Sequence, residues 1–372
     1  MRAVMMISSI AMGGAERILV SVLPHFKEQG VDIRLCSLNT RRDSPLIEQF
    51  TESGIPRFDL GARRMVDPAA WRRFTTMLRD EKIDIVHAQD QDTNIYAALA
   101  RRRLGIPSVM TRHVMVEPSE GIKETLRARL VLLAARYGFD RIIAVSEAVR
   151  EAFSKLAKID SERIETIYNG IEIERFDTHS ARDAKRAEMG WPLDQPTVIM
   201  VAVLRPGKGH EVLFDAIPRL KEAVPGVRIK LVGGGELEDE LRQQAAPYGE
   251  TVEFLGQRMD VPDLLGASDV MVLPSWSEAL PTVLIEAGAA GLPVVATDVG
   301  GSAEIVKDAE TGYIVPPGDS AAIADRLIAV LKDPGAAMAM GDRARDFVTA
   351  TFSLEEQARR TIALYEKVIN SR

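Results

Sequence analysis

Cysteine is nearly absent from this chain of 372 residues, whose single thiol is Cys36. One cysteine excludes an intrachain disulfide and a thiolate-rich metal site, and it fits a reducing compartment. Aromatic residues make up only 5% of the chain, and the sequence pI is about 5.5. Few stacking side chains and no overall basic charge argue against nucleic acid as a partner.

Long apolar runs are also absent, since none approaches the roughly 18 residues that a transmembrane helix needs. The first residues combine an arginine, a short apolar stretch and then glycines. That order indicates a first strand and its turn rather than a secretory signal. We therefore expect a cytoplasmic protein, one that can still meet the inner membrane from its surface.

Four short motifs with known chemistry are missing. Gly13-Gly14 and Gly233-Gly234-Gly235 lack the third glycine of a dinucleotide fingerprint, and Lys208 is followed by glycine rather than by the Ser or Thr of a phosphate-binding P-loop. The chain has neither an H-E-x-x-H nor a G-x-S-x-G sequence. The sequence therefore gives no motif evidence for a dehydrogenase, a P-loop ATPase, a zinc protease or a serine hydrolase.

Short β-branched runs alternate with helical segments along the whole chain, which predicts βαβ units and parallel sheets. The pattern weakens over residues 171–196, a polar stretch that we interpret as a linker. We expect an α/β protein of two doubly wound domains facing a cleft, residues 1–172 and 173–352, with a last helix over 353–372. The expected strands are Val4–Ser8, Val31–Leu38, Ile83–His87, Ser108–Thr111, Arg141–Val145, Ile164–Tyr168, Val198–Val203, Arg228–Val232, Val252–Leu255, Val270–Leu273, Val294–Thr297 and Tyr313–Val315.

The acidic pair Asp90 and Asp92 follows one expected strand. A D-x-D sequence can hold a divalent metal on a nucleotide diphosphate, or its first member can cap the next helix. Charge is also uneven, with a net +3 over residues 1–182 and −10 over 183–372. The imbalance indicates either different partners for the two halves or drift between domains.

The segment from Val270 to Gly301 is the most informative part of the chain. A strand ends near Pro274, a loop follows, and Pro281 can open a helix as its first residue. The amides of Ala279, Leu280, Thr282 and Val283 would then lack partners within the helix. Because ligands of open α/β sheets bind where strands end, these amides predict an anion site.

Two carboxylates frame this anion site. Glu278 precedes the helix and Glu286 lies one and a half turns inside it, so the two would bracket a long ligand rather than act as a catalytic pair. Alternatively, Glu278 caps the helix and Glu286 is solvated, although the surrounding VLIEAGAA is apolar. A second strand leads into RPGKGHE, which carries Arg205 and Lys208. Two cations beside bare amides would clamp a diphosphate, whereas a solvated turn is the other interpretation.

These residues resemble the retaining glycosyltransferases of family 4, which have the GT-B fold. The resemblance is carried by E-x7-E over 278–286, GLPVVATDVGGSAEIV, GYIVPPGD, the early GGAER, DIVHAQ, TRH at 111–113, IYNGIEIERF, RPGKGHE, LVGGGEL and FLGQR, in the family's order along nearly the whole chain.

The resemblance implies a role for each matching residue. Glu286 would hold the ribose of a sugar nucleotide and Glu278 the hydroxyls of the donor sugar. The diphosphate would lie on the amides of 279–282, a stretch that includes Pro281, and on the cations of Arg205 and Lys208. Gly14 would approach the phosphates or the acceptor, and His113 would reach the transferred sugar. Gln257 and Arg258 would line the base. No cofactor and no obligatory metal would be needed.

Two positions depart from the family pattern. Val203 stands where the family has an arginine, so that Arg205 would substitute for it, and Gln89 replaces the second histidine of an H-x-H. His87 is retained, and we interpret it as structural. His25, His179 and His210 have no assigned chemistry, and we expect them at the surface. The family mechanism is front-face attack, in which the leaving phosphate helps to remove the acceptor proton.

The acceptor is suggested by charge alone. Basic and apolar residues alternate over Ile122–Tyr137, which predicts either a helix resting on an anionic membrane or a core-facing helix with a charged outer face. We expect a UDP- or GDP-sugar donor and a glycan or lipid-linked acceptor of the cell envelope. Alternatives are a sugar-nucleotide epimerase or phosphorylase of the same fold, or a non-catalytic sugar-nucleotide binder.

Overall fold

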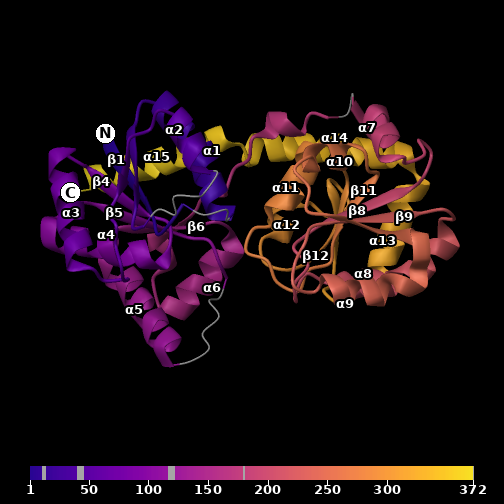
Figure 1. Ribbon diagram of the computed structural model, residues 1–372, viewed down its shortest axis with the longest axis horizontal. Coiled ribbons are helices and arrows are strands. Elements are labelled where there is room, and N and C mark those ends of the chain that lie inside the picture. Colours follow the sequence, from indigo (N-terminus) through magenta and orange to yellow (C-terminus); the bar gives the residue numbers. More distant parts are fainter. Residues whose placement is uncertain (11–13, 40–45, 116–121, 179–180, 372) are drawn as a thin grey trace. The chain divides into compact units, whose positions relative to one another are not determined.

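The computed structural model describes residues 1–10, 14–39, 46–115, 122–178 and 181–371 (Figure 1). It divides the chain into unit 1, formed by Met1–Gly170 with Leu354–Arg372, and unit 2, formed by Ile171–Ser353. The expected boundaries, after residues 172 and 352, lie within two residues of these. Each unit is a parallel sheet flanked by helices, so the predicted α/β, doubly wound fold class is confirmed.

Unit 1 contains a sheet of seven parallel strands in the order β3-β2-β1-β4-β5-β6-β7. The chain order reverses between β1 and β4, which makes the carboxyl ends of these strands the place where a ligand is expected. The strands are β1 (Arg2–Ile7), β2 (Asp32–Ser37), β3 (Arg57–Asp59), β4 (Ile85–Ala88), β5 (Ser108–Arg112), β6 (Arg141–Ala144) and β7 (Ile164–Thr166).

The helices of unit 1 include the last one of the chain. Apolar residues of α15, among them Leu354, Leu364 and Tyr365, belong to the same buried cluster as Met5 of β1 and Phe26 of α1. The C-terminal segment therefore completes the core of the N-terminal sheet. The helices are α1 (Gly14–Glu28), α2 (Leu46–Glu52), α3 (Pro68–Asp80), α4 (Gln91–Leu104), α5 (Ile122–Gly138), α6 (Glu147–Ala157) and α15 (Leu354–Asn370), with a 3-10 turn at Ser161–Arg163.

Unit 2 contains six parallel strands in the order β10-β9-β8-β11-β12-β13, with the reversal between β8 and β11. Figure 1 shows α8 and α13 on one side of this sheet and α11 and α14 on the other. The strands are β8 (Thr197–Val201), β9 (Arg228–Val232), β10 (Val252–Gly256), β11 (Val270–Leu273), β12 (Val294–Thr297) and β13 (Gly312–Val315). The helices are α7 (Arg182–Met189), α8 (His210–Ala223), α9 (Glu238–Ala245), α10 (Val261–Gly266), α11 (Thr282–Ala289), α12 (Ser302–Ile305), α13 (Ser320–Lys332) and α14 (Pro334–Thr351), with 3-10 turns at Ile173–Phe176 and Ala246–Thr251.

The polar stretch over 171–196, interpreted as a linker, is instead part of unit 2. Its helix α7 buries Arg186 completely, and the guanidinium donates to the carbonyl of Ala267 at 2.8 Å and pairs with Asp269 at 2.9 Å. Lys185 is also buried and pairs with Asp260 at 2.5 Å. The linker interpretation was wrong because this segment attaches to the fold through paired charges rather than through an apolar stripe.

Candidate active site

The anion site predicted from the sequence lies at the carboxyl edge of the unit 2 sheet, where β11 leads into α11. Pro281 was expected as the first residue of α11, but it is the N-cap, and its side chain accepts no hydrogen bond from the helix. Thr282 and Val283 are half-buried, and their amides belong to the first turn, where a helix has no internal acceptor for them. The helix N-terminus therefore presents N–H groups and a positive dipole end toward any anion that reaches it.

Lys208 and Glu278 meet beside this helix, although 70 residues separate them. The Lys208 ammonium lies 2.6 Å from Oε1 of Glu278, and the Ser275 hydroxyl donates to the same oxygen at 2.7 Å. The two charged side chains are 15% and 11% exposed. The N-cap of α11 is Pro281 and not Glu278. The alternative in which Glu278 caps the helix is thus wrong, and the carboxylate belongs to a partly buried charge pair.

Close backbone contacts hold these loops together. A Cβ on Gly300, whose φ is +52°, would lie 1.7 Å from the carbonyl oxygen of Glu278. A Cβ on Gly209, whose φ is +74°, would lie 1.9 Å from the carbonyl oxygen of Pro274. Trp276 further donates its amide to the carbonyl of Gly207 at 2.9 Å. Because only glycine fits at 209 and 300, the positions of Lys208 and Glu278 depend on both glycines.

The remaining predicted donor residues of unit 2 differ in how firmly they are held. Arg205 is exposed, Gln257 is exposed beside Gly234, and Glu286 is half-buried within α11. Arg258 instead forms a fork with the carboxylate of Asp260, at 2.8 and 2.6 Å. This fork, together with Lys185, holds the pKa of Asp260 well below its ordinary value. The guanidinium of Arg258 is therefore tied to α10 rather than presented freely to a base.

His210 was expected at the surface, and the structure contradicts this. Its imidazole is 1% exposed at the start of α8, and burial lowers its pKa to about 4. His25, by contrast, is half-buried beside Glu28, and His179 lies outside the described residues.

His113 is the predicted site residue of unit 1, and it follows β5 directly. Its Nε2 lies 2.9 Å from the side-chain oxygen of Gln89, which follows β4. Burial, with a smaller contribution from the charge of Arg112, lowers the pKa of His113 to about 4, so the ring is neutral at pH 7. Gly14 is the first residue of α1, while the loop over 11–13 lies outside the described residues.

His87 is buried, as its structural interpretation requires. Its Nδ1 lies 2.5 Å from the hydroxyl of Tyr365 on α15, and its Nε2 lies 2.7 Å from the hydroxyl of Thr111. Asp90 is the N-cap of α4 and forms a capping box with Thr93. The capping interpretation of Asp90 is therefore confirmed.

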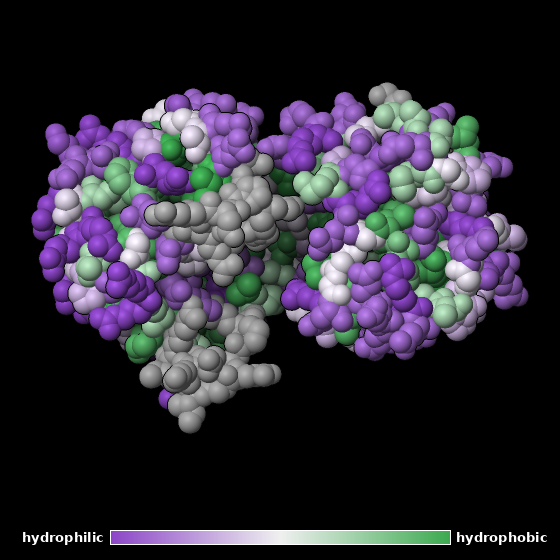
Figure 2. Space-filling model, in the orientation of Figure 1, coloured by the Kyte–Doolittle hydropathy of each residue, from purple (hydrophilic) through white to green (hydrophobic). Residues whose placement is uncertain are grey.

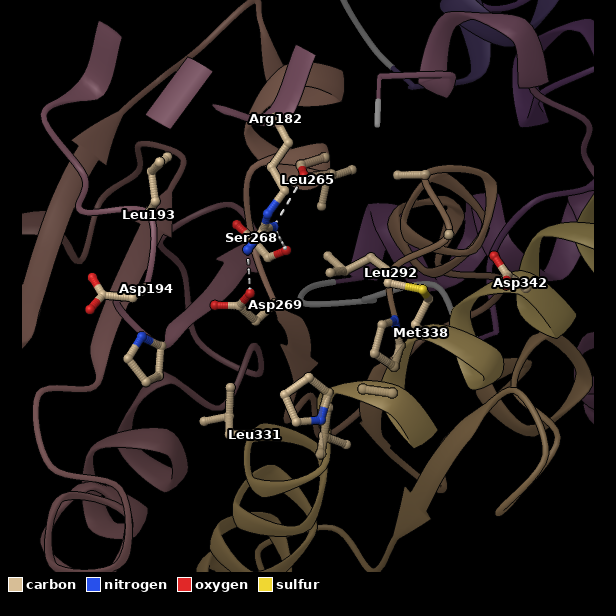
Figure 3. A pocket seen from close by; sticks show the side chains of 18 residues that line it. Arg182, Leu193, Asp194, Leu265, Ser268, Asp269, Leu292, Leu331, Met338 and Asp342 are labelled. Carbon is tan, nitrogen blue, oxygen red and sulfur yellow. Dashed lines mark hydrogen bonds and ion pairs between the residues drawn. The ribbon is translucent and has the colours of Figure 1, made fainter. Parts of the chain in front are cut away.

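A cavity of about 370 Å³ in unit 2 lies at the opposite edge of the sheet (Figure 3). Its walls include Pro196, Asp269 and Pro293, which precede β8, β11 and β12, so the cavity is at the amino ends of the strands. Arg182 reaches the carbonyl of Ser268 and the carboxylate of Asp269 within it, at 2.7 and 2.5 Å. None of the predicted donor residues lines this cavity, so it is separate from the anion site.

Family models of known proteins match both halves of the chain. The family model described as glycosyl transferases group 1 matches residues 181–347, and the one described as Glycosyltransferase Family 4 matches residues 12–175. A phosphatidyl-myo-inositol mannosyltransferase of Mycobacterium leprae is 30% identical over 332 residues, which cover 86% of this chain and 84% of the relative.

Two further proteins are similar at lower coverage or identity. The relative from Escherichia coli named UDP-Gal:alpha-D-GlcNAc-diphosphoundecaprenol alpha-1,3-galactosyltransferase is 29% identical over 265 residues, covering 69% of this chain and 68% of that protein. The crystal structure of Anabaena Alr3699/HepE in complex with UDP-glucose matches with a TM-score of 0.80 and 25% identity, covering 98% of this chain and 99% of that one.

Two doubly wound units, together with the matching family models, identify a glycosyltransferase of the GT-B class. Two of the relatives just described are named as a mannosyltransferase and a galactosyltransferase, which agrees with the hexosyltransferase expected from the sequence. Within that class, the chain belongs to the family 4, group 1 glycosyltransferases.

Proposed function

We propose that this enzyme transfers a sugar from a nucleotide diphosphate to an acceptor hydroxyl with retention of the anomeric configuration. The observation that carries the proposal is the Lys208–Glu278 pair directly before the open first turn of α11. A cation and bare amides favour a diphosphate, whereas a carboxylate favours the hydroxyls of a sugar. The pair therefore offers both chemistries close to the helix, with Glu278 three residues before the N-cap Pro281.

The protein contributes mainly electrostatic stabilisation in this proposal. As the bond between the sugar and the diphosphate breaks, negative charge grows on the leaving phosphate. Lys208, Arg205 and the amides of α11 stabilise that charge without a bound metal. The leaving phosphate oxygen takes the proton of the attacking hydroxyl, and the new glycosidic bond forms on the same face. Glu278 and His113 orient the sugar, and Glu286 holds the ribose.

The donor and acceptor classes rest on the named proteins. One similar structure holds UDP-glucose, which supports a UDP-sugar, with a GDP-sugar as the second candidate. Two relatives are named for acceptors that carry a lipid, phosphatidyl-myo-inositol and a diphosphoundecaprenol glycan. We propose a lipid-linked or envelope glycan acceptor, used by a cytoplasmic enzyme.

A surface of unit 1 fits an enzyme that works at a bilayer. Leu130, Leu133 and Tyr137 on α5 are 45%, 54% and 56% exposed, while Val131 and Ala135 face the core. Arg129 is exposed beside them. Among the residues that Figure 2 colours by hydropathy, hydrophilic ones predominate on the face in view. None of the described helices combines the length and apolar composition needed to cross a bilayer. We propose that α5 rests on an anionic membrane surface.

The test is a donor screen followed by analysis of the product. Purified protein is incubated with UDP-, GDP- and ADP-sugars and a short-chain lipid acceptor, in the presence of EDTA, and proton NMR reads the anomeric configuration of the product. We expect a retained linkage and activity that EDTA does not remove. Near-normal rates in both Lys208→Ala and Glu278→Ala would contradict the proposal, and an epimer formed without acceptor would indicate an epimerase.

A further inference from the structure

A chain of polar side chains, buried except for the half-buried His113, runs through unit 1 from His113 to α15. It contains His113, Gln89, His87 and Tyr365, with Thr111 beside His87. We propose that Gln89 is a positioning residue, whose amide fixes His113 as the tautomer that carries its proton on Nε2 and leaves Nδ1 as the acceptor offered to the substrate. The inference rests on the proposed function, since it assumes that His113 contacts the transferred sugar.

The hydrogen bond between the two side chains sets the direction of donation. The side-chain oxygen of Gln89 lies 2.9 Å from Nε2 of His113, and Gln89 is 7% exposed. An amide oxygen can only accept, so Nε2 must donate. Within the described residues, Nδ1 of His113 forms no hydrogen bond. A neutral ring with its proton on Nε2 therefore presents a lone pair, and not an N–H group, at its other nitrogen.

His87 determines which way the amide of Gln89 faces. The amide nitrogen lies 3.3 Å from Nε2 and 3.5 Å from Nδ1 of His87. Both ring nitrogens already have shorter partners, the hydroxyls of Thr111 and Tyr365. The amide N–H group therefore lies over the ring rather than in its plane, a weak but favourable contact. Turning the amide around would place its oxygen against the same electron-rich face and remove the acceptor from His113.

Because burial keeps both histidine rings neutral, His87 and His113 can differ only in which ring nitrogen carries the proton. Burial lowers the pKa of His87 to about 3, with the charge of His113 as a smaller cause, and burial and Arg112 lower that of His113 to about 4. Burial raises the pKa of Tyr365, so its hydroxyl stays protonated. Arg112 is thus the charged group acting on His113, and His87 and Tyr365 are neutral. With both rings neutral at pH 7, each carries one proton, and its location depends on the neighbouring amide and hydroxyls.

The first measurement uses the free enzyme and does not depend on turnover. Imidazole nitrogens are labelled with ¹⁵N, and the His113 signals are assigned by their loss in His113→Asn. We expect the Nε2–H tautomer in the unsubstituted protein and a mixture of tautomers in Gln89→Met, which keeps the side-chain volume but has no acceptor. An Nδ1–H tautomer in the unsubstituted protein overturns the proposal, whatever the variants do.

The second measurement is the pH dependence of transfer. Gln89→Glu places a carboxylate at Nε2, which raises the pKa of His113, so we expect the rate to fall below neutral pH and to recover as pH rises. Gln89→Met is expected to lower kcat/KM by on the order of 10- to 100-fold. The matched control is Gln29→Met, since Gln29 lies in the same unit and its amide donates to the carbonyl of Glu355.

The results distinguish the positioning role of Gln89 from the proposed function. An unchanged tautomer and an unchanged pH profile in the Gln89 variants would show that Gln89 only fills space. Tyr365→Phe is a second route to the same result if Gln89→Met does not fold, because it removes one anchor of His87 and is expected to weaken the tautomer preference. If no nucleotide sugar is turned over at all, the proposed function fails, while the NMR result on His113 still decides the role of Gln89.

Discussion

Lys208 and Glu278 form a partly buried charge pair, since 2.6 Å separates the ammonium nitrogen from Oε1 and the Ser275 hydroxyl donates to the same oxygen. The pair joins the loop after β8 to the loop after β11. Two residues that the family pattern assigns to different parts of the donor, the diphosphate and the sugar, are therefore coupled before any donor binds.

This coupling is measurable in a double-mutant cycle. Lys208→Met and Glu278→Gln should each lower the free energy of unfolding by roughly 1–3 kcal/mol, because each leaves a partly buried partner without its counter-charge. The double variant should lose less than the sum of the two. Urea unfolding measures all four proteins, with Lys221→Met on the exposed part of α8 as the control. Additive losses would show that the two side chains do not depend on each other.

The close approach of Gly300 to Glu278 gives a second prediction. Gly300→Ala should lower the free energy of unfolding by roughly 2–4 kcal/mol and weaken binding of a nucleotide sugar, because its Cβ would overlap the Glu278 carbonyl. Gly226→Ala is the matched control, since its φ is +81° but nothing lies within 4 Å of its Cβ. Thermal unfolding and calorimetry compare them. Equal losses would mean that the strain of a positive φ, and not the overlap, explains the effect.

Acid should destabilise the enzyme through its buried histidines. The pKa of His210 is lowered to about 4 in the folded protein, from an ordinary value of 6.5. Between pH 6.5 and 4 the unfolded chain binds one more proton at this site. The stabilisation is therefore complete above pH 6.5 and is lost as pH falls, by up to about 1.4 kcal/mol per pH unit. Urea midpoints at pH 7, 6 and 5 should fall less steeply for His210→Asn, and parallel curves would argue against a buried neutral ring.

The exposed residues of α5 predict binding to lipid vesicles. Replacing Leu130 and Leu133 together by serine should abolish most co-sedimentation with vesicles that contain anionic lipid, because apolar area and arginines both contribute to such binding. Leu156→Ser is the control, since Leu156 is 48% exposed on α6. Higher salt should weaken binding of the unsubstituted protein. Failure of that protein to pellet at low salt would exclude a role for α5 at membranes.

The sequence predicted elements best where apolar runs are short and buried. All six strands of unit 2 were expected, because residues such as Val198 and Val270 are fully buried and β-branched. Strand β3 was missed, since its three residues, Arg57–Asp59, are all at least partly exposed. Helix α7 was missed for a related reason. Its buried side chains, Lys185 and Arg186, are charged, and periodicity arguments recognise only apolar faces.

The candidate site likewise contains one feature that local sequence predicts and contacts that it does not. The open first turn of α11 follows from local sequence, because a proline and a strand end determine where the helix begins. The Lys208–Glu278 pair cannot be predicted in this way, since neither segment contains a signal that the two loops, 70 residues apart, will be in contact. The position of Gln89 between His87 and His113 likewise depends on β4 and β5 being neighbours in the sheet. Long-range pairing is decided by topology, and local pattern carries little information about it.

The arrangement of α15 has a consequence for how the protein is made. Because Leu354, Ala358 and Tyr365 fill the core of unit 1, a ribosome must release the chain through α15 before that core can close. Unit 2 is continuous in the chain, from Ile171 to Ser353, and has its own core. Unit 1 is thus begun first and completed last, so a premature stop between unit 2 and α15 would leave unit 2 whole and unit 1 open to proteolysis and aggregation.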